Sequence, residues 1–487
     1  MSALKQLVII GAGFSGVALA IHASRATDAP LDILLVDPRP EPGSGLAHST
    51  THPDHRLNGL ATLHTIYPEA PAHFSDWVRD GGVLASDPAA LAPNGGVYAR
   101  RRDFGRYMAL ELARHADRNP SGSRLDTVRG RAVGIRRSGA GLCVELQDGR
   151  ELTADRCVLA VGWNAVGVPG PLNAIVGNGG WIGDPWHEER VARIPPRATV
   201  LLMGTGLTAS DTFATLMAQG HQGAVVALSR RGLRPGSQSP FPSRLTSVWG
   251  MLRDPHPAFV ARHGTPTTIR GAMRRLREDI AGLDPSCTSW HAPFDELRNA
   301  VAQFWPALTS TEQRRYVRHV KAWYDTFRFR NPPQIERIVD AGVARGQLRF
   351  VAGHVRDVQA VGSAIDVGYD PRRGSGRMTL RADVVVNCTG PNPRPSASGN
   401  PLWQRLIRDG WARDHPCGVG VDVDLSCRVV DAAGRSDGTL FCIGPPTMGT
   451  FGEATAVPYV ARQVLDTLPA LLYPGAGAAS ADAVRGA

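Results

Sequence analysis

The segment Leu7-Val-Ile-Ile-Gly11-Ala-Gly13-Phe-Ser-Gly16, near the start of the chain, decides the fold. Four apolar residues of strand length run directly into three glycines, and a small apolar stretch over residues 17–24 follows. This order predicts a strand, a tight turn and a helix. The first glycine permits the turn, the second lets a ligand approach the backbone, and the third lets the helix pack against the strand. An ordinary strand-to-helix turn is the simpler alternative.

A carboxylate at the end of the next apolar run gives this glycine turn a chemical meaning. Residues 31–37 form a second predicted strand that ends in Asp37. At that position a carboxylate accepts hydrogen bonds from the hydroxyls of a ribose, while the positive end of the intervening helix favours a diphosphate. A secretory signal has no need of glycines in this register. We therefore predict a dinucleotide site.

The same pattern restarts in the middle of the chain. A predicted strand over residues 200–203 leads into Gly204-Thr-Gly206-Leu-Thr208-Ala, a helix and another strand. The ribose position here carries Ser229, followed by Arg230 and Arg231. A hydroxyl and two guanidinium groups suit a 2′-phosphate, whereas a carboxylate would repel one. We predict NADP at this second site; a solvated loop is the alternative explanation of the two arginines.

Two strand-turn-helix starts predict an α/β fold with two Rossmann-like, doubly wound domains. The segments at residues 157–162, 384–390 and 440–453 resemble those of two-dinucleotide flavoproteins, and this resemblance implies that the NADP domain is inserted into an FAD domain. We expect residues 1–196 to form the first part of the FAD domain and residues 197–380 the NADP domain. Arg-rich helices over about 267–345 are interpreted as a helical insertion. Residues 381–472 are expected to return to the FAD domain, and residues 473–487, rich in Gly and Ala, to be disordered.

Composition narrows the function. The chain has 487 residues and a net charge of +10, which leaves nucleic acid and anionic ligands open, but no helix-turn-helix or aromatic-and-basic RNA motif occurs. None of the seven cysteines forms a Cys-x-x-Cys pair, so neither a dithiol redox site nor a zinc ribbon is expected, and no metal site is predicted. With no long apolar span, we expect a cytoplasmic protein without a membrane or nucleic-acid partner and leave the oligomeric state open.

Two dinucleotide sites without a dithiol point to a flavoprotein of the two-dinucleotide type. Residues 157–162 (Cys-Val-Leu-Ala-Val-Gly) and 384–390 (Val-Val-Val-Asn-Cys-Thr-Gly) resemble the strands that close the nucleotide domains of such proteins. Residues 440–444 and 449–453 are similar to the segment that returns to the FAD domain.

The resemblance extends to a bacterial FAD/NAD(P)-binding protein family and covers nearly the whole chain. The motifs that carry it are Gly43-Ser-Gly-Leu-Ala-His48-Ser49, Leu57-Asn58-Gly-Leu-Ala61, Gly204-Thr-Gly-Leu-Thr208, Ser229-Arg-Arg-Gly232 and Trp323-Tyr-Asp-Thr-Phe-Arg328-Phe-Arg330. The chain departs from the family pattern at His48, Gly59-Leu60 and Phe329, where the family has Tyr, Val-Pro and His. Some members resemble flavin N-monooxygenases that oxidise the amine of aspartate to nitrosuccinate.

This resemblance implies an enzyme that uses FAD, NADPH and O2 to oxygenate a small nucleophilic substrate, an anionic amine or amino acid, through a C4a-hydroperoxyflavin. An NADPH-dependent reductase that passes electrons to a partner or quinone is the alternative. The residues expected to bind FAD are Gly11, Gly13, Phe14, Ser15, Gly16, Asp37, Gly162, Gly444, Thr450 and Phe451. Those expected to bind NADPH are Gly204, Gly206, Thr208, Ser229, Arg230 and Arg231.

Four further residues are candidates for the reaction itself. Asn58 is expected near the flavin, with an ordinary turn cap as the alternative. His48 is expected to orient the flavin or transfer protons near neutral pH, with a solvated loop histidine as the alternative. Arg328 and Arg330 are expected to bind a substrate carboxylate, because a guanidinium group pairs with a carboxylate through two parallel hydrogen bonds. Arg314, Arg318 and Lys321, spaced on one helix face, are interpreted as a solvated face or part of this pocket.

Overall fold

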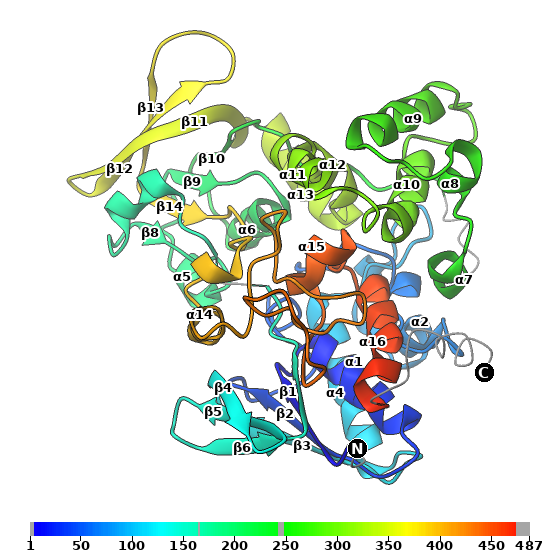
Figure 1. The fold of residues 1–487 in the computed structure, drawn as a ribbon. Coiled ribbons are helices and arrows are strands. Elements are labelled where there is room, and N and C mark those ends of the chain that lie inside the picture. The colour runs from blue at the N-terminus through cyan, green and yellow to red at the C-terminus, as the bar shows by residue number, and fades with distance from the viewer. Residues whose placement is uncertain (1–3, 164–165, 242–247, 474–487) are drawn as a thin grey trace.

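The computed structural model describes residues 4–163, 166–241 and 248–473. Figure 1 shows the two larger β-sheets, one above the other, with a group of helices beside the upper sheet. Both sheets have a parallel core with helices packed against it, so the predicted α/β class with two Rossmann-like units is confirmed. Residues 474–487, nearly all of the tail predicted to be disordered, lie outside the described residues.

The first sheet is parallel throughout and has the strand order β15-β7-β1-β2-β3. Its strands are β1 (Gln6–Ile10), β2 (Asp32–Asp37), β3 (Arg124–Arg129), β7 (Arg156–Leu159) and β15 (Leu440–Cys442). Alternate residues of β1 enter different cores, with Leu7 and Ile9 on one side and Val8 and Ile10 on the other. Burial on both faces explains the continuous apolar run that precedes the first glycine turn.

Helices and a small meander cover the two faces of this sheet. One face packs against α1 (Phe14–Ala26), α4 (Arg101–Asp117) and α16 (Val457–Leu472). The other face packs against α14 (Pro401–Arg408) and the antiparallel meander β4 (Ala132–Ser138), β5 (Gly141–Leu146) and β6 (Glu151–Ala154). The small antiparallel meander expected before the return to the sheet is therefore present.

The second sheet has the strand order β13-β12-β11-β10-β9-β14-β8. Its strands are β8 (Trp181–Ile182), β9 (Val200–Met203), β10 (Val225–Ser229), β11 (Leu348–Val361), β12 (Ala364–Pro371), β13 (Met378–Ala382) and β14 (Val384–Asn387). Helices α5 (Glu188–Ala192), α6 (Leu207–Ala218) and α13 (Pro333–Ala344) share a core with it. Since β8 and β14 lie outside residues 197–380, the chain enters this sheet before the predicted start and leaves it after the predicted end. The division into domains stays a prediction.

The helical insertion forms a body with its own core. It contains α7 (Val248–Arg253), α8 (Ala258–His263), α9 (Ile269–Ala281), α10 (His291–Phe304), α11 (Ser310–Arg315), the π-helical turn η4 (Tyr316–Val320) and α12 (Lys321–Arg328). Its apolar core is built from aromatic and branched residues such as Phe259, Phe294 and Tyr316. The described helices begin earlier than residue 267, and α13 belongs instead to the layer on the second sheet, where it packs on α6.

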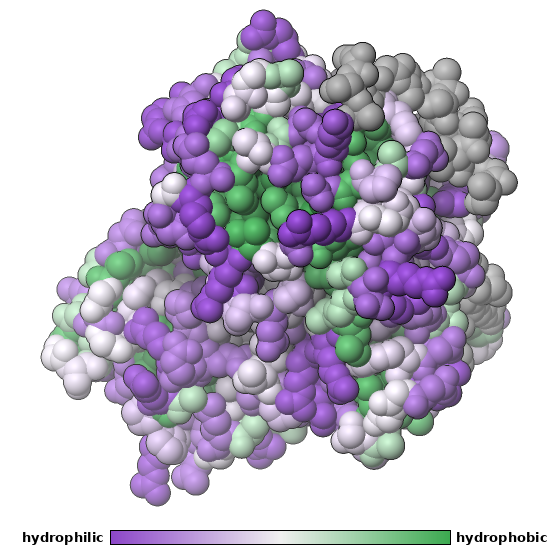
Figure 2. Space-filling model, turned by 90° about the horizontal axis from the view of Figure 1, so that it is seen from below, coloured by the Kyte–Doolittle hydropathy of each residue, from purple (hydrophilic) through white to green (hydrophobic). Residues whose placement is uncertain are grey.

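Short elements complete the described chain. They are α2 (His73–Asp80), α3 (Val83–Ser86), α15 (Met448–Phe451) and the 3-10 turns η1 (Ala61–Leu63), η2 (Pro88–Ala90), η3 (Gly170–Ile175), η5 (Pro395–Ala397) and η6 (Pro445–Thr447). Six of the seven cysteines are buried and Cys287 is exposed. The face in Figure 2 is mostly hydrophilic, and its hydrophobic residues gather in a recessed central area. Within the described residues, no helix combines the length and apolar character that crossing a membrane requires.

Candidate active site

A cavity of about 2570 Å³ lies where the two sheets, the helical insertion and the return segment meet. Residues of both glycine turns line it, among them Gly13 and Thr208. Sites for one small molecule usually have about 300–1,000 Å³. This cavity is therefore large enough for more than one ligand, as a reaction between two cofactors and a substrate requires.

The first glycine turn is built as its sequence predicts. Gly11 has φ +108°, and a Cβ at this position would overlap the carbonyl oxygen of Ala160. Gly13 is the N-cap of α1 and has no side chain to cap the helix, and a Cβ at Gly16 would overlap the carbonyl oxygen of Gly11. Phe14 and Ser15 form the first turn of α1, and together with Gly11 and Gly13 they line the cavity. The uncapped helix end is a site for a phosphate group.

Asp37 lies beside this turn at the end of β2. Its side chain is buried, and its Oδ2 accepts a hydrogen bond of 2.9 Å from the backbone N–H of Ala12. Its Oδ1 accepts hydrogen bonds from the backbone N–H and the Nε of Arg39, at 2.9 and 3.2 Å. A carboxylate has about four acceptor positions, so Asp37 can also receive the hydroxyls of a ribose.

The second glycine turn repeats the first in detail. Gly204 has φ +118°, and a Cβ there would overlap the carbonyl oxygen of Cys388. Its N–H donates to the carbonyl of Leu228 at 2.8 Å, as the N–H of Gly11 donates to the carbonyl of Val36 at 2.8 Å. Gly206 is the N-cap of α6 and likewise offers no side-chain cap. The second turn is thus equally suited to the diphosphate of a dinucleotide.

The residues after β10 are cationic and lack acidic partners. Arg230 and Arg231 line the cavity, and within the described part of the chain neither forms an ion pair. Burial, followed by the charges of Arg230 and Arg372, lowers the pKa of Arg231. Ser229 does not line the cavity: its Oγ accepts from the N–H of Gly232 at 3.0 Å and holds the turn closed.

Asn58 and His48, the two residues expected to take part in the chemistry, both line the cavity, but their surroundings differ. The side chain of Asn58 makes no hydrogen bond to any described residue, so it does not cap its own turn, and only its carbonyl is engaged, by Gln238 Nε2 at 3.0 Å. Gln238 Nε2 also donates to the carbonyl of Asn331 at 3.2 Å. His48 packs edge-on against Phe104, with ring centroids 4.9 Å apart, and burial lowers its pKa to about 3. Desolvation therefore keeps its ring neutral near neutral pH, and the part of His48 in the reaction stays a prediction.

The return segment meets the cavity at other residues than those predicted. Gly444 has φ +80° and donates its N–H to Gln463 Oε1 at 2.7 Å. The hydroxyl of Thr450 donates to the carbonyl of Val423 at 3.1 Å, and Phe451 packs against the apolar core. The cavity wall is formed instead by the entrance to α16, residues 455–460. The sequence signal for this element is Pro458, which lies in the first turn of α16.

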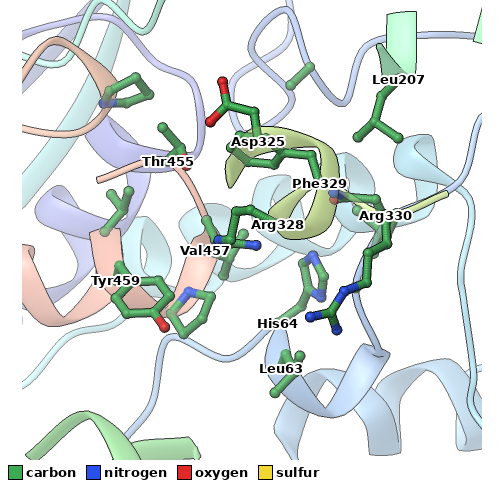
Figure 3. Close-up of a pocket in the computed structure, with 18 of the residues that line it drawn as sticks. Leu63, His64, Leu207, Asp325, Arg328, Phe329, Arg330, Thr455, Val457 and Tyr459 are labelled. Carbon is green, nitrogen blue, oxygen red and sulfur yellow. The ribbon is translucent and has the colours of Figure 1, made fainter. Parts of the chain in front are cut away.

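Buried and half-buried charges lie on the side of the insertion, and we call them the charged cluster: Asp295, Arg298, Arg328 and Arg330, which line the cavity, and Glu453 behind them. The Nε of Arg328 donates to Glu453 at 2.8 Å. Arg330 donates to Asp295 at 2.7 Å, and Arg298 lies 3.1 Å from the same carboxylate. Figure 3 shows Arg328 and Arg330 leaving the end of α12 in different directions, with Tyr459 and Val457 of α16 nearby. Three guanidinium groups against two carboxylates leave one positive charge in excess.

Of the three basic residues predicted to share one helix face, two lie at the cavity. Arg318 and Lys321 line the cavity, whereas Arg314 does not. The π-helical turn η4 lies between Arg314 and Lys321 and changes the spacing of side chains along the helix. Lys321 forms an ion pair with Asp325, whose pKa is raised by burial and whose Oδ1 has no hydrogen-bond partner.

Buried neutral histidines predict how stability depends on pH. Burial lowers the pKa of His64 to about 4, against about 6.5 when unfolded. Between these values the unfolded chain binds a proton that the folded chain does not, so stability falls as the pH falls. In the wild type, His64 should lower the unfolding free energy by about 1–2 kcal/mol between pH 7 and pH 5. The His64→Asn variant should lose that much less over the same range. Urea unfolding at pH 7 and at pH 5 measures the unfolding free energy of both proteins. The exposed His256→Asn is the control, and an unchanged pH dependence in His64→Asn would contradict the prediction.

Two glycine turns that open onto one cavity from two sheets with parallel cores define the fold of two-dinucleotide-binding-domain flavoproteins. Residues 8–164 match the family model described as FAD-NAD(P)-binding, so this part of the chain is an FAD/NAD(P)-binding domain. None of the curated proteins compared with the sequence matches it.

Solved structures of similar fold cover almost the whole chain. The ornithine N-hydroxylase of Kutzneria sp. 744, with reduced FAD, NADP+ and L-ornithine, has a TM-score of 0.63 at 14% identity, covering 96% of this chain and 99% of that one. The reduced ornithine hydroxylase of Pseudomonas aeruginosa has a TM-score of 0.61 at 16% identity, with 96% and 99% covered. L-lysine 6-monooxygenase of Pseudomonas syringae has a TM-score of 0.59 at 16% identity, also with 96% and 99% covered. The resemblance to flavin-dependent N-monooxygenases is thus confirmed at the level of the fold.

Proposed function

We propose that this protein is an FAD- and NADPH-dependent monooxygenase that oxygenates the nitrogen of a small amine bearing a carboxylate. The observation that carries the proposal is the single cavity onto which both glycine turns and the charged cluster open. For a primary amine the balanced reaction consumes the amine, O2, NADPH and a proton, and yields the hydroxylamine, NADP+ and water. Aspartate is a candidate substrate, and the solved relatives named above act on ornithine or lysine.

The residues of the first turn fit FAD. Only glycine is compatible with the backbone at Gly11 and Gly16, where a Cβ would meet a carbonyl oxygen. The open end of α1 would hold the diphosphate, and Asp37 the ribose. Bound there, the flavin would supply what amino acids lack, the acceptance of two electrons from NADPH and the activation of O2.

The protein's own contribution is orientation and the exclusion of water. The insertion is anchored on the return segment by Trp305, whose Nε1 donates to the carbonyl of Gly449 at 2.7 Å. His48 and His64 are neutral, so this part of the wall brings no charge near neutral pH. Asn58 offers an amide that no described residue engages, which suits a hydrogen bond to the reacting groups.

The charged cluster fits a substrate with a carboxylate. Its excess positive charge would attract an anion, and Arg328 uses only its Nε on Glu453. The same charge disfavours the ammonium form of a nearby amine, because like charges lower the pKa of a base. A deprotonated amine is the nucleophile that N-oxygenation needs. We therefore propose that Arg328, with Arg330 held beside it by Asp295, binds the carboxylate.

Replacement of the two cavity arginines tests the coenzyme. We expect Arg230→Ala combined with Arg231→Ala to raise KM for NADPH about tenfold to hundredfold, since hydrogen bonds to charged groups contribute about 1.5–3 kcal/mol. KM for NADH should change little, because NADH lacks the 2′-phosphate. Steady-state rates with both coenzymes measure this. Arg234→Ala is the control, because Arg234 already pairs with Asp340; equal effects on NADPH and NADH would contradict the assignment.

An 18O2 experiment tests the reaction. Protein reconstituted with FAD is supplied with NADPH, 18O2 and single amines, including L-aspartate, L-ornithine and L-lysine. The proposal expects one labelled oxygen in an oxidised amine and a matching consumption of NADPH. NADPH oxidation with hydrogen peroxide as the only oxygen product, for every amine, would instead indicate the reductase. A protein that stays colourless after reconstitution with FAD would refute both.

A further inference from the structure

The helical insertion touches the coenzyme side of the cavity as well as the substrate side. The guanidinium carbon of Arg231 lies 5.8 Å from the ring centroid of Trp323, on α12. The segment after β10 is fixed to the same helix, because the N–H of Gly236 donates to the carbonyl of Thr326 at 2.8 Å. The arginines that follow Ser229 are thus positioned by a helix distant in sequence.

Trp323 is one of two exposed aromatic residues of this helix, with 42% of its surface exposed against 39% for Phe327. The Trp323 ring does not itself line the cavity, but its flat apolar face lies next to Arg231, which does. Burial, and then the positive charges of Arg230 and Arg372, lower the pKa of Arg231, and within the described residues no carboxylate pairs with it. An aromatic face beside guanidinium groups is the chemistry that binds a purine carrying a phosphate.

We propose that Trp323 and Arg231 together form the site for the adenine and 2′-phosphate of the nicotinamide coenzyme. The inference rests on the proposed use of NADPH and adds that the helical insertion supplies a coenzyme-binding residue. The exposed part of the Trp323 ring stacks on the adenine, and Arg230 and Arg231 bind the phosphate. Because Trp323 and Arg328 belong to one helix, the bound coenzyme also stabilises the helix end that carries the substrate arginine.

The test measures binding of 2′,5′-ADP and NADP+ by calorimetry to the FAD-loaded protein, without turnover. We expect Trp323→Leu to weaken both ligands about fivefold to 150-fold, the range that corresponds to about 1–3 kcal/mol for one stacked base. Trp323→Phe should keep most of the affinity. The matched control is Trp411→Leu, because Trp411 likewise lies beside an arginine, Arg137 at 5.1 Å, but packs against the core of the first sheet, and Arg137 does not line the cavity.

The outcomes distinguish the proposed role of Trp323 from the proposed use of NADPH. Unchanged affinity in Trp323→Leu, while the wild type binds 2′,5′-ADP, overturns the inference and leaves the proposed function intact. A wild type that binds neither ligand overturns the NADPH assignment and this inference with it. Thermal unfolding of each variant shows whether it is folded. If Trp323→Leu does not fold, Trp323→Phe is compared with Trp323→His, which carries a smaller ring. Equal affinity of these two variants for 2′,5′-ADP overturns the stacking role.

Discussion

Replacing Gly204 by alanine is expected to unfold the second nucleotide domain locally and to abolish reduction of the flavin by NADPH. The backbone of Gly204 has φ +118°, which costs an L-residue about 1–2 kcal/mol or more. The added Cβ would also overlap the carbonyl oxygen of Cys388, so β9 and β14 would have to separate. FAD should stay bound, because its turn lies on the other sheet.

Gly206→Ala is the matched control two residues away. Gly206 has φ −86°, and a Cβ there meets nothing within 4 Å. This variant should keep its melting temperature within a few degrees yet bind NADPH more weakly, because the methyl group stands where a diphosphate approaches the helix end. Differential scanning calorimetry measures the melting temperature, flavin absorbance measures the bound FAD, and stopped-flow spectroscopy measures the reduction of the flavin by NADPH. A Gly204→Ala protein as stable as Gly206→Ala would refute the steric argument.

The second large effect is expected at Arg328. Arg328→Met leaves the carboxylate of Glu453 buried without its partner, which costs about 3–5 kcal/mol of unfolding free energy. Arg328 holds the pKa of Glu453 below its usual value, against a desolvation effect that alone would raise it, so the variant should also take up a proton there.

A second substitution separates stability from binding. Arg328→Met combined with Glu453→Gln removes both charges and should regain most of the stability, but not the affinity for a carboxylate substrate. The exposed pair Arg356–Asp370 is the control, since Arg356→Ala should cost less than about 1 kcal/mol. Urea unfolding and substrate titration measure the two quantities. Recovery of substrate affinity in the double variant would exclude Arg328 as the carboxylate-binding residue.

The parts of the fold that the sequence predicts are those governed by local physics. Apolar runs and glycine spacing are sufficient for both turns, because φ and the lack of a Cβ are properties of single positions such as Gly11 and Gly204. The position of Arg328 also follows from a local motif. Its partner Glu453 does not, because 125 residues separate the two in sequence and only the packing of α12 against the return segment brings them together.

The other differences between the predicted and the observed structure also arise from packing between distant parts of the chain. A π-helical turn changes the spacing between Arg314 and Lys321, and the hydrogen-bond pattern that makes it depends on packing. Thr450 and Phe451 turn away from the cavity because α15 directs them into neighbouring structure. The proton affinity of His48 depends on burial, which no residue type in its motif reveals.

The cysteines of this chain have a consequence for its durability. Burial raises the pKa of all six buried thiols, as at Cys388, where the pKa is about 12. Peroxide attacks the thiolate and not the thiol, so these sulfurs react slowly with it. Sulfur oxidation at cysteine is then concentrated on Cys287, the exposed one. Peroxide released by the proposed oxygenation is therefore expected to modify Cys287 before the buried cysteines.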